Sequence, residues 1–133
     1  MNPSAIAALA QAVDSEQPRE QRARSAAAVV RAAGTYRGVA IYDVGDDELS
    51  LLAGAGSSAA NPRSDVGQEV SGEAVRTRAT VMRGPQIAVP VLGAETGIVI
   101  GTLAVETDGA QTFSRGEIEF LEECAGVLRP LYD

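Results

Sequence analysis

QIAVPVLGAETGIVIGTLAVETDGAQTFSRGEIEFLEECAGVL, residues 86–128, is the stretch that decides the fold. Residues 87–92 and 98–105 are two apolar runs rich in β-branched side chains, and Gly93 and Gly97 flank the short connection between them. This pattern is typical of two antiparallel strands joined by a short loop. A turn follows the second run, and the rest of the stretch has the apolar spacing of a helix.

The start of this helix carries several N-terminal signals. Ser114 can accept a hydrogen bond from a backbone N–H of the first turn, and Glu117 can reach back to the Ser114 N–H. Phe113, which precedes the cap, can pack on Ile118. The sequence therefore predicts a capping box and a hydrophobic staple around residue 114, with a helix beyond them.

Two further helices are predicted at the start of the chain. The dipeptide Asn-Pro at residues 2–3 is typical of a helix N-terminus, and apolar residues then recur at helical spacing. The dipeptide Asp-Ser at residues 14–15 is predicted to cap a second helix, which includes the alanine-rich residues 25–33 and ends at Gly34. The alanines give this helix a smooth surface, and the C-terminal helix is its predicted partner.

The middle of the chain is predicted to form a β-hairpin and a short helix. Residues 37–44 and 48–54 are apolar runs on either side of the turn sequence Gly-Asp-Asp, so we expect them to pair. Ser71 is predicted to be the N-cap of a two-turn helix that runs through Arg78.

Length and composition indicate one domain. A chain of 133 residues with 45% hydrophobic content can bury one core and is too short for two. We describe it as an N-terminal helical segment, residues 1–17, followed by the main part of the domain, residues 18–133. Cys124 is the single cysteine and histidine is absent, so neither a disulfide within the chain nor a metal site is expected, and no cofactor is indicated.

The charge of the chain excludes some partners. The net charge is −7, every basic residue is arginine, and no basic stripe is present, so we expect no binding to nucleic acid. No apolar run approaches the roughly 18 residues that a membrane span needs, and the N-terminus lacks the features of a signal peptide. A cytoplasmic protein that does not bind membranes is the expectation.

Several segments, in order along the chain, resemble a GAF domain. AVPV, IGTLAVE and FSRGEIEFLEECA resemble the C-terminal half of the family, and GVAIYDVGDDELSLLAGAG and GQEVSGEAVRTRATV resemble its first hairpin and middle segment. The resemblance covers residues 18–131. It implies an α+β fold with a central antiparallel five- to six-stranded sheet, the N- and C-terminal helices on one face, and a short helix and loops on the other.

The face of the sheet away from the terminal helices is the predicted ligand site. Alternation places hydroxyl, carboxylate and small side chains on this face of the last strand, and the resemblance places the first strand beside it. The predicted ligand contacts are Tyr42, Ser71, Val75, Thr102 and Glu106. The carboxylate favours a cationic ligand, and the phenol can stack on a flat one. Residues 83–86 are too few for the lid of many ligand-binding GAF domains, which implies an open or shallow site.

The C-terminal helix carries two apolar stripes, about 100° apart around its axis. One stripe can cover the sheet. The other needs a second apolar surface, which is either the alanine-rich helix of the same chain or a second subunit. We predict a homodimer with an interface formed by Val30, Phe120, Cys124, Val127 and Leu131. Cys124 is interpreted as a packed side chain rather than a reactive thiol.

Three functions are compatible with these residues. The favoured one is a stand-alone sensory or regulatory domain for signal transduction, which binds a small molecule or a partner protein. The second is an enzyme, because the free methionine-(R)-sulfoxide reductases resemble GAF domains and use several cysteines and acidic ligands. In this chain Gln86 and Ala104 stand where that family has acids, and no cysteine precedes the C-terminal helix, so this activity is not expected. The third is a structural dimerisation module without a ligand.

Overall fold

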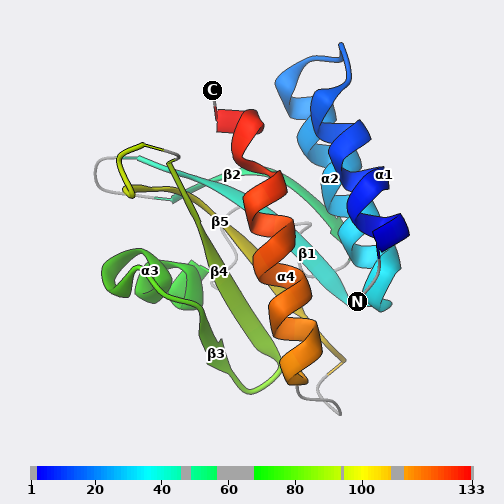
Figure 1. Cartoon of the computed structure of the whole chain (residues 1–133). Coiled ribbons are helices and arrows are strands. Elements are labelled where there is room, and N and C mark those ends of the chain that lie inside the picture. The colour runs from blue at the N-terminus through cyan, green and yellow to red at the C-terminus, as the bar shows by residue number, and fades with distance from the viewer. Residues whose placement is uncertain (1–2, 46–48, 57–67, 94, 109–112, 133) are drawn as a thin grey trace.

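The computed structural model, shown in Figure 1, describes residues 3–45, 49–56, 68–93, 95–108 and 113–132. The elements are, in order, α1 (Pro3–Asp14), α2 (Arg19–Gly34), β1 (Gly38–Val44), β2 (Leu49–Gly56), α3 (Gln68–Thr77), β3 (Val81–Arg83), β4 (Gln86–Leu92), β5 (Val99–Glu106), α4 (Arg115–Val127) and the 3-10 turn η1 (Arg129–Tyr132). The described strands form one antiparallel sheet in the order β2-β1-β5-β4-β3. None of the described helices has the length and apolar character that crossing a membrane requires.

Helices cover both faces of the sheet (Figure 1). α1, α2 and α4 lie on one face, and α3 lies on the other face against β4 and β5. Alternate strand residues point toward the three helices and form the main core with them. Leu9 and Val13 of α1 belong to this same buried cluster. The predicted α+β architecture, with the terminal helices on one face and a short helix on the other, is confirmed.

The ends of α2 differ from the sequence prediction. Its N-cap is Pro18, which makes no side-chain cap hydrogen bond, so the dipeptide at residues 14–15 does not cap it. At the other end Gly34 is still helical, and Thr35 is the left-handed residue, with φ of 51°. A Cβ on Gly34 would lie 2.2 Å from the Tyr36 ring. This glycine is therefore needed for the packing of the ring and not for a left-handed turn.

The N-terminus of α4 agrees with its prediction. Ser114 Oγ accepts a hydrogen bond from the Glu117 N–H at 3.1 Å, and Glu117 Oε1 accepts one from the Ser114 N–H at 3.2 Å, which confirms the capping box. The packing of the helix differs from expectation, because α1 contacts both α2 and α4. α1 therefore supplies a helical surface for α4, while the alanine-rich α2 packs on β1, β2 and α1.

Candidate functional site

The patch on the α3 side of the sheet begins with two neighbouring central strands. β1 and β5 pair antiparallel, with Tyr42 opposite Thr102 and Ala40 opposite Ala104. Alternation puts these four side chains on the face away from α1, α2 and α4. Tyr42, Ala40 and Ala104 form a buried cluster of their own, separate from the main core, against which two leucines of β2 pack, Leu49 and Leu51.

α3 brings Ser71 onto this patch. Thr102 Oγ1 donates a hydrogen bond to Ser71 Oγ at 2.9 Å, and both side chains are fully buried. Because α3 begins at Gln68, Ser71 lies inside the helix and is not its N-cap, which corrects the sequence prediction. The hydrogen bond to Thr102 on the sheet explains a serine at this position of α3, since buried hydroxyls are almost always hydrogen-bonded. Val75, one turn further along α3, is half-buried beside it.

The phenol of Tyr42 differs from the other polar groups of the patch. The residue is only 3% exposed, and burial raises the pKa of its hydroxyl. Within the part of the chain that the structure describes, this hydroxyl makes no hydrogen bond. The Tyr42 backbone carbonyl, in contrast, accepts a hydrogen bond from the Tyr132 hydroxyl at 2.8 Å. None of the described buried side-chain polar atoms lacks a hydrogen-bond partner, so this unpaired hydroxyl lies where the small exposed part of the residue reaches solvent.

The C-terminal turn holds β1 from the opposite face of the sheet. A Cβ on Gly101 would lie 2.2 Å from the Tyr132 hydroxyl, so the glycine makes room for that side chain to reach β1. Arg19 lies over the Tyr132 ring at 5.5 Å, and its Nε donates to the Leu131 carbonyl at 2.6 Å. These contacts fix the backbone of β1 directly behind the Tyr42 side chain.

Glu106 lies on the same face but at the far end of β5. It is four positions from Thr102, which is roughly 13 Å along an extended strand. Its carboxylate is half-buried and accepts a hydrogen bond from Gln86 Nε2 at 3.5 Å. The structure thus brings together Tyr42, Thr102 and Ser71, with Val75 at their border, and leaves Glu106 outside this group.

Known structures identify the fold. No family model matches the chain, and no curated protein matches it. The GAF domain from an Acinetobacter phosphoenolpyruvate-protein phosphotransferase superposes with a TM-score of 0.79 at 19% identity, over 99% of this chain and 92% of its own. The corresponding GAF domain from Coxiella burnetii gives 0.77 at 15% identity, over 96% and 89%. This chain has a GAF-like fold.

An enzyme shares this fold. The free methionine-R-sulfoxide reductase from Neisseria meningitidis, in complex with its substrate, superposes on the GAF-like chain with a TM-score of 0.81. The identity is 24%, and the match covers 98% of this chain and 87% of the reductase. Similarity at this level establishes the fold, and one fold hosts both sensory domains and enzymes, so the site has to decide the function.

The residues predicted to form a dimer interface lie mainly inside the single GAF-like chain. Val30, Cys124 and Leu131 are at most 1% exposed and Phe120 is 7% exposed, whereas Val127 is half-buried. Four of the five side chains are therefore core residues, because the helices and sheet of the same chain cover the second stripe of α4. Burial also raises the pKa of the Cys124 thiol to about 12. The homodimer itself stays a prediction.

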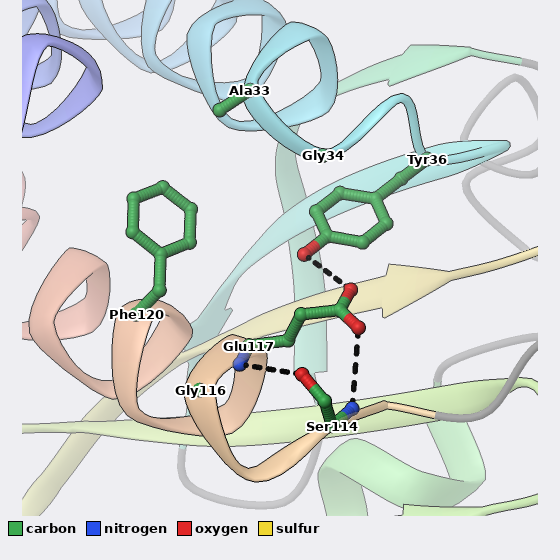
Figure 2. A pocket seen from close by; sticks show the side chains of 7 residues that line it. All are labelled: Ala33, Gly34, Tyr36, Ser114, Gly116, Glu117 and Phe120. Atoms are coloured by element: carbon green, nitrogen blue, oxygen red, sulfur yellow. Dashed lines mark hydrogen bonds between the residues drawn. The ribbon is translucent and has the colours of Figure 1, made fainter. Parts of the chain in front are cut away.

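A cavity that sequence reasoning missed opens between the end of α2 and the start of α4 (Figure 2). The Tyr36 hydroxyl donates a hydrogen bond to Glu117 Oε2 at 3.3 Å. The cavity has a volume of about 320 Å³ and is lined by Ala33, Gly34, Tyr36, Ser114, Gly116, Glu117 and Phe120. Tyr36 and Glu117 are 81 positions apart in the sequence, so no local pattern pairs them. The sequence did contain one indication of such a contact: a capping box uses only one carboxylate oxygen of Glu117, so the other oxygen is left for a further partner.

Proposed function

We propose that this GAF-like domain is a sensory or regulatory module that binds a small molecule on the sheet face that carries Tyr42, Thr102 and Ser71. One observation supports it above the others: Tyr42 is only 3% exposed, yet its hydroxyl reaches solvent and has no hydrogen-bond partner among the described residues. A polar group of a ligand at this place would supply the missing partner. The hydroxyls of Thr102 and Ser71 lie close by, but they are fully buried and bonded to each other, so Tyr42 is the polar group of the three that a ligand can reach.

The patch favours a small ligand with hydrogen-bonding groups. Its polar atoms belong to neutral hydroxyls, while the carboxylate of Glu106 lies roughly 13 Å further along β5. Ala40 and Ala104 form the next pair of residues along these strands and place small apolar side chains beside Tyr42. A ligand that contacts Tyr42 therefore does not need a positive charge, and Glu106 is a contact for a longer ligand.

The alternative function, a thiol-dependent reductase, needs a reactive cysteine, and the cysteine of this chain is poorly suited to that role. Cys124 is the single cysteine of the chain, is 1% exposed, and has its thiol pKa raised to about 12 by burial and by the neighbouring Glu123. The reactive form of cysteine is the thiolate, which such a pKa suppresses at neutral pH. Cys124 also packs in the main core, on the opposite side of the sheet from Tyr42. These observations favour a binding function over a thiol-dependent one.

Native mass spectrometry of the protein purified from its own source tests the proposal. We expect a species heavier than the 13.7 kDa chain by the mass of one small molecule. Tyr42→Phe removes the phenol hydroxyl and keeps the ring, so it should release most of the bound ligand. Tyr36→Phe is the comparison variant, because it removes a phenol hydroxyl from the separate cavity on the other side of the sheet, and release by this variant alone would place the bound molecule there.

The same variants and mass measurements distinguish the small-molecule hypothesis from the structural dimerisation module and from the reductase. If wild-type protein has only the mass of the chain or of its multiples, the structural dimerisation reading replaces the small-molecule one. If Tyr36→Phe and Tyr42→Phe release the ligand equally, the binding site is not the patch on the α3 side. Activity on free methionine sulfoxide that disappears in Cys124→Ser would instead establish the reductase.

A further inference from the structure

The Tyr36–Glu117 cavity, defined above by its seven lining residues, combines aromatic rings with one carboxylate. Tyr36 and Phe120 are 4% and 7% exposed, so the rings are held firmly in place by packing. In Figure 2 the phenol points toward the Glu117 carboxylate, and the Phe120 ring comes from the next turn of α4. Gly34 permits this arrangement, since a Cβ there would overlap the Tyr36 ring.

The carboxylate of Glu117 is hydrogen-bonded only to neutral donors. Oε1 accepts from the Ser114 N–H at 3.2 Å, and Oε2 accepts from the Tyr36 hydroxyl at 3.3 Å. None of the described residues that line the cavity is basic. A carboxylate has about four lone-pair sites, so two remain for a further donor. The negative charge of Glu117 therefore lies in the wall of the cavity without a cationic side chain beside it.

One of the two helix ends at the cavity favours the same sign of ligand. Ala33 and Gly34 belong to the C-terminal end of α2, which carries partial negative charge. The N-terminal end of α4 has the opposite partial charge, but Ser114 Oγ and Glu117 already neutralise its first turn through the capping box. The burial of Tyr36 and its contact with Glu117 both raise the pKa of the phenol, so that it stays a neutral donor.

We propose that the Tyr36–Glu117 cavity binds a small organic ammonium ion, with the charge against Glu117 and the carbon atoms against the Tyr36 and Phe120 rings. The Glu117 carboxylate supplies a direct charge interaction, and the parts of the two rings that line the cavity supply an apolar wall for the carbon atoms. The volume of about 320 Å³ is at the low end of ligand pockets, which suits an ion of this size.

A metal ion fits this cavity poorly. Calcium and magnesium need several oxygen ligands arranged around the ion, and the cavity offers one carboxylate and two hydroxyls. In the described part of the chain, no group of three or more acidic or thiol side chains is placed to hold a metal. The rings of Tyr36 and Phe120 instead favour an ion that carries its own apolar groups.

Choline and its neutral isostere 3,3-dimethylbutan-1-ol provide the test on the intact chain. Both are titrated into isotope-labelled protein, and amide shifts are followed by NMR. Choline should shift the amide signals of Gly34, Gly116 and Glu117, with millimolar affinity, and the neutral isostere should bind roughly tenfold more weakly. Shifts confined to the α3 side of the sheet, or equal binding of the two compounds, would overturn the proposal.

Two substitutions on one helix sharpen the test. Glu117→Gln removes the charge but keeps a side chain that can complete the capping box, and we expect roughly tenfold weaker choline binding. Glu119→Gln also removes one negative charge from α4, at an exposed position paired with Arg115, and should bind choline like the wild type. Equal affinity of Glu117→Gln and wild type contradicts the proposal. The comparison of choline with its isostere on wild-type protein remains decisive if Glu117→Gln is unstable.

Discussion

The two faces of the sheet use the same strands for different purposes. On β5, Leu103 and Val105 point toward α1, α2 and α4 and are at most 1% exposed. Thr102 and Ala104 alternate with them and point toward α3, where small and hydroxyl-bearing side chains replace branched apolar ones. Burying apolar area stabilises the fold, while burying a hydroxyl costs free energy unless it is hydrogen-bonded. The helix-facing residues of this strand therefore contribute mainly apolar burial, and the alternate residues lie on the face of the proposed ligand site.

The largest expected effect is a difference in stability between substitutions on the two faces of the sheet. Leu103→Ala should lower the free energy of unfolding by about 2–5 kcal/mol, because the side chain is fully buried among the helices and leaves a cavity. Urea unfolding monitored by circular dichroism measures the loss. Ala104→Gly on the other face should cost about 1 kcal/mol or less, mainly through the entropy of the unfolded chain. Equal losses at the two positions would contradict the division of roles.

Alkaline pH should destabilise the fold mainly through the helix-facing side, because the pKa of Tyr42 on the other face is raised in the same direction but by less than those of Cys124, Tyr36 and Tyr132. The pKa of Cys124 is raised from 9.0 to about 12, so the folded state holds its proton over a pH range in which the unfolded state has lost it. The stability from this group is fully present below about pH 9 and falls as pH rises toward about 12. The slope is at most about 1.4 kcal/mol per pH unit for one group.

Urea unfolding at a series of alkaline pH values checks this expectation. Tyr36 and Tyr132 act in the same direction, because burial raises the pKa of both phenols. Cys124→Ala should therefore reduce the slope without abolishing it. A free energy of unfolding that stays constant up to about pH 11 would show that Cys124 is open to solvent.

Local patterns in the sequence predicted much of this fold. The capping box at Ser114 needs only residues within one turn, and the β4–β5 hairpin needs only two apolar runs and a short loop. Alternation also placed Tyr42 and Thr102 on one face once the resemblance had made β1 and β5 neighbours. The elements that agree with prediction are those whose determinants are close together in the chain.

The departures involve partners that are distant in the sequence. Ser71 is a good N-cap residue by type, but its hydroxyl is bonded to Thr102 on the sheet, 31 positions away. Gly34 fits the usual helix-ending glycine, yet the Tyr36 ring is what requires it. The Tyr36–Glu117 cavity depends on how α2 and α4 pack, which no periodicity in either helix shows.

Val127→Glu tests whether the helix layer has a further role as a contact surface between subunits. Val127 is the half-buried member of the predicted interface, and the homodimer predicts about twice the monomer mass in sedimentation at micromolar concentration. A new charge in a packed interface should dissociate the dimer, at a cost of about 1–3 kcal/mol. Ala28→Glu, on an exposed position of α2, is the control for added charge. A wild-type protein that sediments as a monomer removes the homodimer.

The smallest expected effect concerns the face that carries the proposed ligand site. Thr102→Val keeps the shape of the side chain and removes the hydroxyl that donates to Ser71, so the free energy of unfolding should fall by about 0.5–1.5 kcal/mol. Ser71→Ala in the Thr102→Val background should cost little more, because the two hydroxyls act as one pair. If the two losses are additive in this double-mutant cycle, each hydroxyl has its own partner. Additive losses in ligand-free protein would contradict the Thr102–Ser71 hydrogen bond. Additive losses that occur only in protein with a retained ligand would show that the ligand binds both hydroxyls.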